Sequence, residues 1–105
     1  MKTGYIRFSD TNGIEINLIN NTVWLNANEI ADLFGVSIST VNKHLKEVFK
    51  DNLIREYEVV KEYRYTCFKH GECIRVYYNL EVIICLSFRI QSLYAKAFRE
   101  WVFCS

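Results

Sequence analysis

The sequence NANEIADLFGVSISTVNKHLKEVF, residues 26–49, predicts two short helices separated by a single glycine. Asn26 and Glu29 have the spacing of a capping box, in which each side chain accepts a hydrogen bond from the other residue's backbone N–H. Gly35 is expected to end the first helix, because glycine readily adopts the left-handed backbone that other residues resist. The apolar residues of this helix fall on one face, and they are Ile30, Leu33 and Phe34. This is the pattern of a helix-turn-helix.

The second helix of the pattern begins near Ser37, whose hydroxyl can cap it. Its apolar positions recur every three or four residues, at Ile38, Val41, Leu45 and Val48. The remaining positions are polar and mildly basic and are expected to face outward: Ser39, Thr40, Asn42, Lys43, Lys46 and Glu47. His44 lies beside the apolar stripe, and we expect it to be a packed residue and not a ligand.

The outward face has the side chains that a helix needs in the major groove of DNA, where small and amide groups contact bases and lysines contact phosphates. Thr40 and Asn42 would read bases, and Lys43 and Lys46 would hold phosphates. The alternative is a face that is merely solvated, because any two amphipathic helices joined by glycine show the same pattern.

Length and composition predict one globular domain over residues 1–105, with a modest core that requires neither disulfides nor metal. Half of the residues are apolar. No run is long enough to span a membrane, and the start MKTGYIRF lacks the apolar core of a signal peptide. We therefore expect a cytoplasmic location with four reduced cysteines.

The net charge of +1 argues against a nucleic-acid partner, because such domains usually show a basic footprint. The charge is nevertheless unevenly distributed. Residues 37–50 contain three basic and one acidic side chain, and residues 64–105 contain six basic and three acidic ones. This distribution is compatible with one basic face on a nearly neutral protein.

The amino-terminal part predicts a β-hairpin, with strands at residues 5–8 and 14–18 joined by the turn-forming Ser-Asp-Thr-Asn-Gly. Residues 22–25, Thr-Val-Trp-Leu, are β-branched and aromatic and predict a short third strand directly before the first helix.

A second hairpin is predicted where the apolar period becomes two, from about Glu56 to Tyr78. A two-residue His70-Gly71 turn would pair Phe68 with Cys73. One face of the hairpin, expected to be core, then holds Tyr63, Tyr65, Cys67, Ile74, Val76 and Tyr78. The other face, expected to be half exposed, holds Arg64, Thr66, Phe68, Cys73, Arg75 and Tyr77.

A hairpin directly after a helix-turn-helix is typical of the wing of a winged helix. Its exposed basic groups, Arg64, Lys69 and Arg75 together with His70, would contact phosphates or the minor groove. Alternatively, the hairpin only covers the helices, and the predicted pairing does not distinguish these interpretations.

Cys67, His70 and Cys73 have a C-x-x-H-x-x-C spacing that suggests zinc or a disulfide across the turn. In the register above, the two cysteines lie on opposite faces, so neither a metal site nor a disulfide is expected. Cys85 and Cys104 have no neighbouring base that would make them nucleophiles.

Two carboxy-terminal helices are predicted, one capped by Asn79 and one capped by Ser92. The first would bury Leu80, Ile83, Ile84 and either Ser87 or Phe88. The second would bury Tyr94, Ala97, Phe98 and Trp101. The chain stops one residue after Cys104 without a polar tail, so we expect a domain truncated from a longer protein.

These elements predict an α+β fold of the winged helix-turn-helix type. The amino-terminal β-hairpin and strand occupy residues 1–25, the helix-turn-helix 26–49, the wing hairpin 56–78 and two helices 79–103.

Several segments together resemble the amino-terminal domain of the bacterial RhuM virulence-protein family. They are Thr22-Val23-Trp24-Leu25, Ile30-Ala31-Asp32-Leu33-Phe34-Gly35-Val36, Lys43-His44-Leu45 with Val48-Phe49, Tyr77-Tyr78-Asn79-Leu80 with Ile83-Ile84, Arg89-Ile90-Gln91-Ser92, and Phe98-Arg99-Glu100-Trp101. The last segment, extended to Ala95, also resembles the end of the amino-terminal domain of phage antirepressor and baculovirus-repeat proteins.

The resemblance implies a DNA-binding module, often the front part of a longer chain, and brings no catalytic residues. Two positions differ from the family pattern. Ser37 and Ile38 stand where the family's second helix usually begins with an acidic residue and an arginine, which removes a phosphate contact. The wing turn is Lys69-His70-Gly71-Glu72 in place of an acidic turn that contains glycine.

The leading hypothesis is a regulatory or virulence-associated domain that binds double-stranded DNA. Its contact residues would be Ser37, Ser39, Thr40, Asn42, Lys43, Lys46, Arg64, Lys69 and Arg75. The alternative is a protein-interaction or dimerisation module of the same shape, a homodimer held through Tyr94, Phe98, Trp101 and Phe103. An enzyme is not expected, because the sequence lacks paired carboxylates, a phosphate-binding glycine loop and a nucleophile with a base. No cofactor and no small-molecule substrate are expected.

Overall fold

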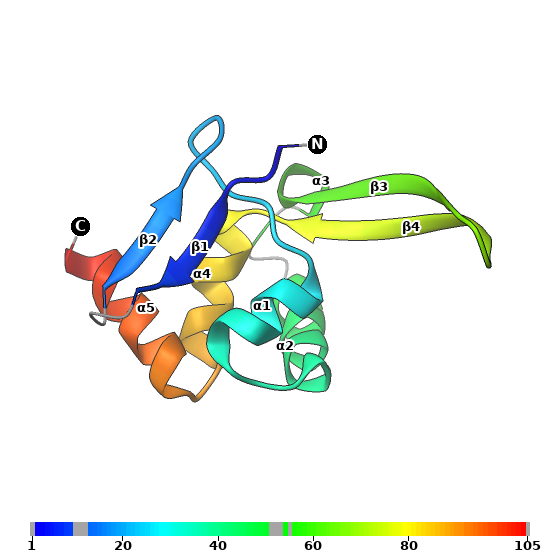
Figure 1. Cartoon of the computed structure of the whole chain (residues 1–105). Helices are drawn as coiled ribbons and strands as arrows, with labels where there is room; N and C mark the ends of the chain where they lie inside the picture. The colour runs from blue at the N-terminus through cyan, green and yellow to red at the C-terminus, as the bar shows by residue number, and fades with distance from the viewer. Residues whose placement is uncertain (1, 10–12, 51–53, 55, 105) are drawn as a thin grey trace.

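The computed structural model describes residues 2–9, 13–50, 54 and 56–104, which form an α+β fold with two small antiparallel sheets (Figure 1). The strands are β1 (Tyr5–Phe8), β2 (Ile14–Asn17), β3 (Val60–Cys67) and β4 (Gly71–Tyr78). The helices are α1 (Ala27–Phe34), α2 (Ile38–Lys50), the single turn α3 (Glu56–Val59), α4 (Leu80–Arg89) and α5 (Leu93–Cys104). The predicted α+β class is confirmed.

The amino-terminal hairpin is confirmed, with β1 paired to β2 so that Tyr5 lies opposite Asn17 and Phe8 opposite Ile14. The predicted turn falls largely on residues 10–12, which lie outside the described residues. Ile6 is buried, and the Phe8 ring lies 5.2 Å from the ring of Tyr94 on α5. The hairpin thus covers one side of the helices.

The third strand predicted at residues 22–25 is wrong. This segment makes only isolated bridges, from Thr22 to Ile19 and from Leu25 to Tyr78. Val23, Trp24 and Leu25 are all buried in succession, whereas a strand at a sheet surface would alternate its side chains between two faces. The segment therefore runs through the core from the amino-terminal hairpin to α1, with a single bridge to Tyr78 of β4.

The two helices predicted from residues 26–49 are confirmed in detail. The Glu29 N–H donates to Asn26 Oδ1 at 2.9 Å, and the Asn26 N–H donates to Glu29 Oε1 at 3.0 Å, which completes the capping box. Gly35 follows α1 with a φ of 65°. Ser37 Oγ accepts a hydrogen bond from the Thr40 N–H at 3.2 Å, as expected of a cap.

The buried stripe of α2 is shorter than predicted. Val41, Leu45 and Val48 are buried, but Ile38 is 40% exposed. Ile38 is the first residue of the helix, so its side chain lies at the edge of the core.

The carboxy-terminal helices complete the core. Asn79 Oδ1 accepts from the Val82 N–H at 3.3 Å, and Ser92 Oγ accepts from the Ala95 N–H at 3.0 Å, so both predicted caps are confirmed. Phe98 is fully buried, with its ring 5.6 Å from that of Phe34 on α1.

Two positions in the last helix differ from the predicted face. Tyr94, expected inside, is 52% exposed, and Ala95 is buried in its place. Of the alternatives Ser87 and Phe88, Ser87 is the buried one and Phe88 is 47% exposed. A shift of one residue moves a side chain about 100° around a helix, so a small error in the assumed face exchanges neighbouring positions.

Arg99, the arginine of the Phe-Arg-x-Trp segment near the end of the chain, connects α5 to α4. Its guanidinium donates hydrogen bonds to the backbone carbonyls of Ser87 and Ile90 at the end of α4. The last carbonyls of a helix have no partner within that helix. Arg99 therefore fastens α5 to α4 by satisfying them.

The β3–β4 hairpin projects from the helical body (Figure 1). The strand begins at Val60, and residues 56–59, predicted as part of the hairpin, form the helical turn α3 instead. The predicted register is wrong: Cys67 pairs with Gly71 and Tyr65 with Cys73. The turn therefore comprises the three residues 68–70, followed by Gly71 with a φ of 70°.

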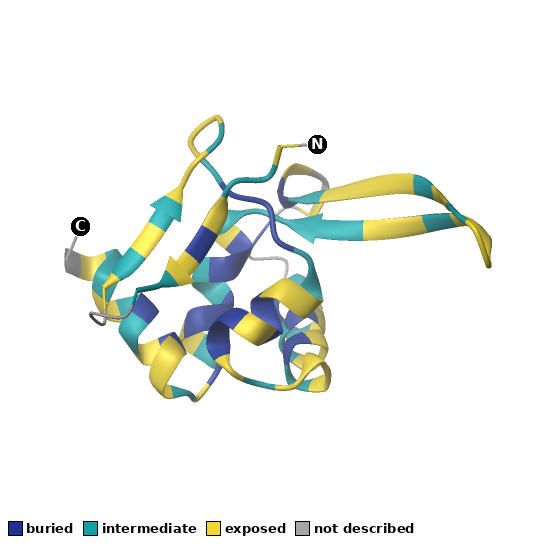
Figure 2. Cartoon of the chain, viewed as in Figure 1, coloured by how far each residue is buried: buried dark blue, intermediate teal, exposed yellow. Residues whose placement is uncertain are grey.

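The shift in register changes which residues share a face. Because paired residues of a sheet lie on one side of it, Cys67 and Cys73 now share a face, whereas Arg64 and Arg75 lie on opposite faces. The prediction that one face is core is also wrong. Tyr63 is 45% and Ile74 51% exposed, and Figure 2 shows exposed positions along most of both strands.

Candidate functional site

The outer face of α2 carries the most coherent set of predicted site residues. Ser39, Asn42, Lys43 and Lys46 are all exposed, while Val41, Leu45 and Val48 on the opposite side of the helix are buried. The four polar side chains thus project from a helix whose position the core determines. The capping of both helices further orders this face.

Ser37 and Thr40 contact each other at the start of α2, where Ser37 was expected to act as the cap. Their hydroxyl groups lie 2.9 Å apart, and Ser37 Oγ also accepts the Thr40 N–H. Thr40 is half-buried. Both hydroxyls therefore have partners within the first turn of α2, which leaves Asn42 as the more exposed of the two residues expected to read bases.

Glu47, predicted to face outward, instead connects α2 to α4. Its carboxylate accepts a hydrogen bond from the Arg89 guanidinium at 3.2 Å and lies 3.5 Å from His44 Nδ1. His44 is half-buried beside the apolar stripe, as expected of a packed residue. The carboxylate is thereby kept on the side of α2 that faces α4.

A shallow depression joins the outer face of α2 to the base of the β3–β4 hairpin. Its lining comprises Asn42, Leu45, Lys46, Phe49, Glu56 and Tyr78. The rings of Phe49 and Tyr78 stack with their centroids 6.2 Å apart, and burial raises the pKa of Tyr78. The surface that contains Asn42 and Lys46 therefore continues onto β4.

The predicted basic residues of the hairpin are divided among three places. Arg64 lies on the face that also carries Tyr78 and forms an exposed ion pair with Glu72 at 3.3 Å. Lys69 is exposed in the turn. Arg75 lies on the opposite face, 5.1 Å from the centre of the Tyr65 ring, and hydrogen bonds to Tyr77 and Tyr65 raise its pKa.

Lys61 is a cation that the sequence analysis missed. Its ammonium group lies 4.5 Å from the centre of the Trp24 ring, on the same hairpin face as Arg75. The contact joins the base of the hairpin to the core, because Trp24 is buried. Lys61 and Trp24 are far apart in the sequence. No sequence pattern indicates that their side chains meet.

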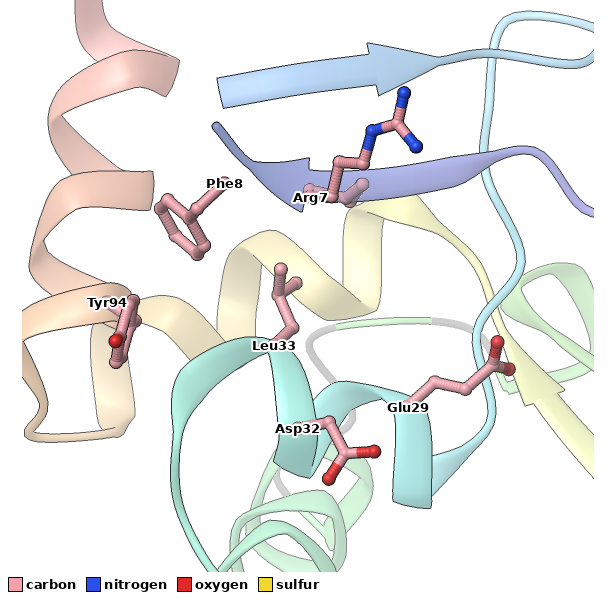
Figure 3. Close-up of a pocket in the computed structure, with 7 residues that line it drawn as sticks. Arg7, Phe8, Glu29, Asp32, Leu33 and Tyr94 are labelled. Atoms are coloured by element: carbon pink, nitrogen blue, oxygen red, sulfur yellow. The ribbon is translucent and has the colours of Figure 1, made fainter. Parts of the chain in front are cut away.

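A second pocket lies between β1, α1 and α5, and Figure 3 shows the side chains around it. The Arg7 guanidinium forms an ion pair with Glu15 at 2.7 Å, and the Glu29 carboxylate belongs to the capping box. Phe8, Leu33 and Tyr94 supply apolar walls. In Figure 3 the carboxylates of Glu29 and Asp32 point away from the space between Phe8 and Tyr94. This arrangement offers no convergent set of acid, base and nucleophile.

No group of three or more histidine, cysteine or acidic side chains suited to a metal ion occurs within the part of the chain that the structure describes. The correction of the hairpin register is relevant here, because Cys67 and Cys73 do share a face. His70, the third member of the C-x-x-H-x-x-C spacing, lies in the exposed turn between them.

Comparisons of the chain with protein-family models, with curated protein sequences and with solved structures yield no match. The resemblance to the RhuM family therefore stays a prediction. Among the described residues, no helix is both long enough and apolar enough to cross a membrane.

Proposed function

We propose that this chain is a winged helix-turn-helix DNA-binding domain in which α2 enters the major groove. The observation that carries the proposal is the exposed row of Ser39, Asn42, Lys43 and Lys46 on a helix whose other side is buried. A rigid helix with amide, hydroxyl and ammonium groups on its free face has the chemistry that groove recognition requires.

The roles within this row follow from the side chains. The Asn42 amide can donate to and accept from the edge of an adenine, which gives sequence preference. Lys43 and Lys46 supply positive charge to phosphates, which gives affinity without preference and makes binding depend on salt. Ser39 adds a hydroxyl at the amino-terminal end of the row, where recognition helices usually contact DNA.

The hairpin would act as the wing through Arg64 and Lys69. Arg64 shares a face with Tyr78, which lines the same depression as Asn42 and Lys46. Arg75 lies on the other face and already contacts two tyrosines. We therefore assign Arg64 and Lys69 to phosphate contacts, and we assign Arg75 to stabilising the hairpin.

The resemblance to the RhuM family agrees with this proposal and extends it. A domain of that kind would serve as the DNA-binding front part of a longer bacterial regulatory or virulence-associated protein.

Fluorescence anisotropy of a labelled mixed-sequence duplex, titrated with the protein at low and at physiological salt, tests the proposal. We expect binding that weakens steeply with salt, because released counterions drive it. Lys43→Glu should weaken binding to all duplexes, and Asn42→Ala should mainly reduce the preference among sequences.

Lys96→Glu is the matched control, because Lys96 is an exposed lysine on α5 outside the proposed face. Equal loss of binding in Lys43→Glu and Lys96→Glu would show that net charge alone is responsible. Absence of binding by the unaltered protein at low salt would reject the proposal.

A second function, self-association, is favoured by the exposed apolar side chains of α5. Leu93 is 84%, Tyr94 52% and Phe103 76% exposed. Of the aromatic residues first expected in such an interface, Phe98 is buried and Trp101 half-buried, so they belong to the core. Sedimentation equilibrium of the protein and of Leu93→Ser tests this function: a dimer that weakens in the variant supports it, and a monomer at high concentration rejects it.

A further inference from the structure

Two cysteines lie on one face of the β3–β4 hairpin, next to its turn. Cys67 on β3 is paired with Gly71 on β4. Cys73 lies two residues after Gly71 on β4 and is paired with Tyr65. Gly71 has no side chain, and a Cβ placed there would meet nothing within 4 Å. Cys73 is therefore the diagonal neighbour of Cys67 on the same face, beside an open position.

The turn gives Cys67 a distinct chemical environment. Hydrogen bonds from the backbone N–H groups of Lys69 and His70 lower the pKa of the Cys67 thiol. Such donors stabilise the thiolate, which is the nucleophilic form of cysteine. Cys85 on α4 shows the opposite effect, because burial raises the pKa of its thiol. Among the three cysteines whose side chains the structure describes, Cys67 has a lowered pKa and shares its hairpin face with Cys73, whereas Cys85 has a raised pKa.

We propose that Cys67 and Cys73 form a dithiol site that low-molecular-weight disulfides oxidise to an intramolecular disulfide across the hairpin tip. The Cys67 thiolate attacks one sulfur of the small disulfide, which forms a mixed disulfide and releases one small thiolate. The Cys73 thiolate then attacks the Cys67 sulfur and releases the second. Two electrons pass from the protein to the small disulfide, and the two protons lost by the cysteines end on the two released thiols.

Forming this bond requires a small adjustment of the hairpin tip. Diagonal neighbours in a sheet have Cα atoms roughly 7–8 Å apart, and a disulfide requires about 4.4–6.8 Å. Closure therefore requires the strands to approach slightly at the tip. Residues 68–71 are all exposed, so this approach disturbs no core packing. The assignment concerns the hairpin alone and stands apart from DNA binding.

Trypsin provides a direct test, because it cleaves after Arg64, Lys69 and Arg75 and so separates the two cysteines into the peptides 65–69 and 70–75. The full chain is equilibrated in buffers of increasing ratio of oxidised to reduced glutathione, quenched with acid and alkylated. We expect an intact monomer about 2 Da lighter, and we expect the two peptides to appear joined by a disulfide.

Single variants distinguish the steps. Cys73→Ser should accumulate glutathione on the peptide 65–69, because the resolving thiol is gone, and Cys67→Ser should react with glutathione much more slowly. Cys85→Ser is the matched control and should form the 65–69 to 70–75 link as the unaltered protein does.

Three results would overturn the proposal. After treatment with oxidised glutathione alone, the two peptides could be recovered separately, each with its cysteine alkylated. The link could occur only in covalent dimers. Cys85 could react with glutathione as fast as Cys67.

Discussion

The helical body and the β3–β4 hairpin contain the same kinds of large apolar side chain and place them in opposite environments. In the body, formed by α1, α2, α4 and α5, Phe34 and Phe98 are fully buried and pack edge to face. In the hairpin, Tyr63 and Tyr65 stack on each other at 6.5 Å at the surface, and Phe68 is fully exposed at the tip. A pair of strands that projects from the body has two free faces and no second layer to bury either one.

This difference shows which region of the chain contributes most to its stability. Apolar area removed from water stabilises the body. The hairpin is held by backbone pairing, by surface contacts between aromatic and basic side chains and by its attachment near Trp24. Changes in the body should therefore alter the free energy of unfolding, whereas changes at the hairpin tip should alter it little.

The largest expected effect is that of Phe98→Ala. Removing a fully buried ring that contacts Phe34 leaves a cavity and should lower the free energy of unfolding by about 3–5 kcal/mol. Urea denaturation followed by circular dichroism measures this change. A loss below about 1 kcal/mol would show that the body is not the stabilising region.

Arg99→Ala should have the next largest effect. The guanidinium satisfies the carbonyls of Ser87 and Ile90 at the end of α4, and its removal leaves both without this donor. We expect a loss of about 1–3 kcal/mol in the same denaturation experiment. Lys96→Ala on the exposed side of α5 is the control and should be nearly neutral. Equal effects of the two variants would contradict the assigned role.

Gly71→Ala tests the backbone of the hairpin turn. Gly71 has a φ of 70° with open space around it, so alanine would add backbone strain without a clash. The expected loss is about 1–2 kcal/mol in the local stability of the hairpin, with the free energy of unfolding of the whole chain little changed. Amide hydrogen exchange should locate it in β3 and β4, with the protection of α1 and α4 unchanged. Faster exchange throughout the body would show that hairpin and body unfold together.

Phe68→Ala should have the smallest effect and is the counterpart of Phe98→Ala. Phe68 is fully exposed, so its replacement should change the free energy of unfolding by less than about 0.5 kcal/mol. The same denaturation curves provide the measurement. A loss similar to that of Phe98→Ala would mean that the tip packs against another part of the molecule or a second copy.

Local patterns in the sequence were sufficient to predict the positions of the helices and their capping residues. The capping residues Asn26, Ser37, Asn79 and Ser92 all make the hydrogen bonds expected of them. A cap depends on a side chain and a backbone group three residues apart, so nothing distant in the chain needs to be known. The exposed positions of α2 could be predicted for the same reason, because they follow from the helical period.

Local sequence patterns could not predict the pairing register of the β3–β4 hairpin. His70-Gly71 as a two-residue turn and residues 68–70 as a three-residue turn are both acceptable local solutions, and they differ in which side chains share a face. A buried face would have decided between them, but both faces of this hairpin are largely exposed. The prediction accordingly separated Cys67 from Cys73 and grouped Arg64 with Arg75, and both results are wrong.

By itself, the sequence determined the α+β class, the helix caps, the amino-terminal hairpin and the polar face of α2, because periodicity and short-range hydrogen bonds encode these features. Only the tertiary structure decided that residues 22–25 cross the core, that Lys61 meets Trp24, that Arg99 fastens α5 to α4 and that the two hairpin cysteines are neighbours. Each of these depends on groups brought together by packing or strand register, and the sequence spacing of the residues involved carries little information about either.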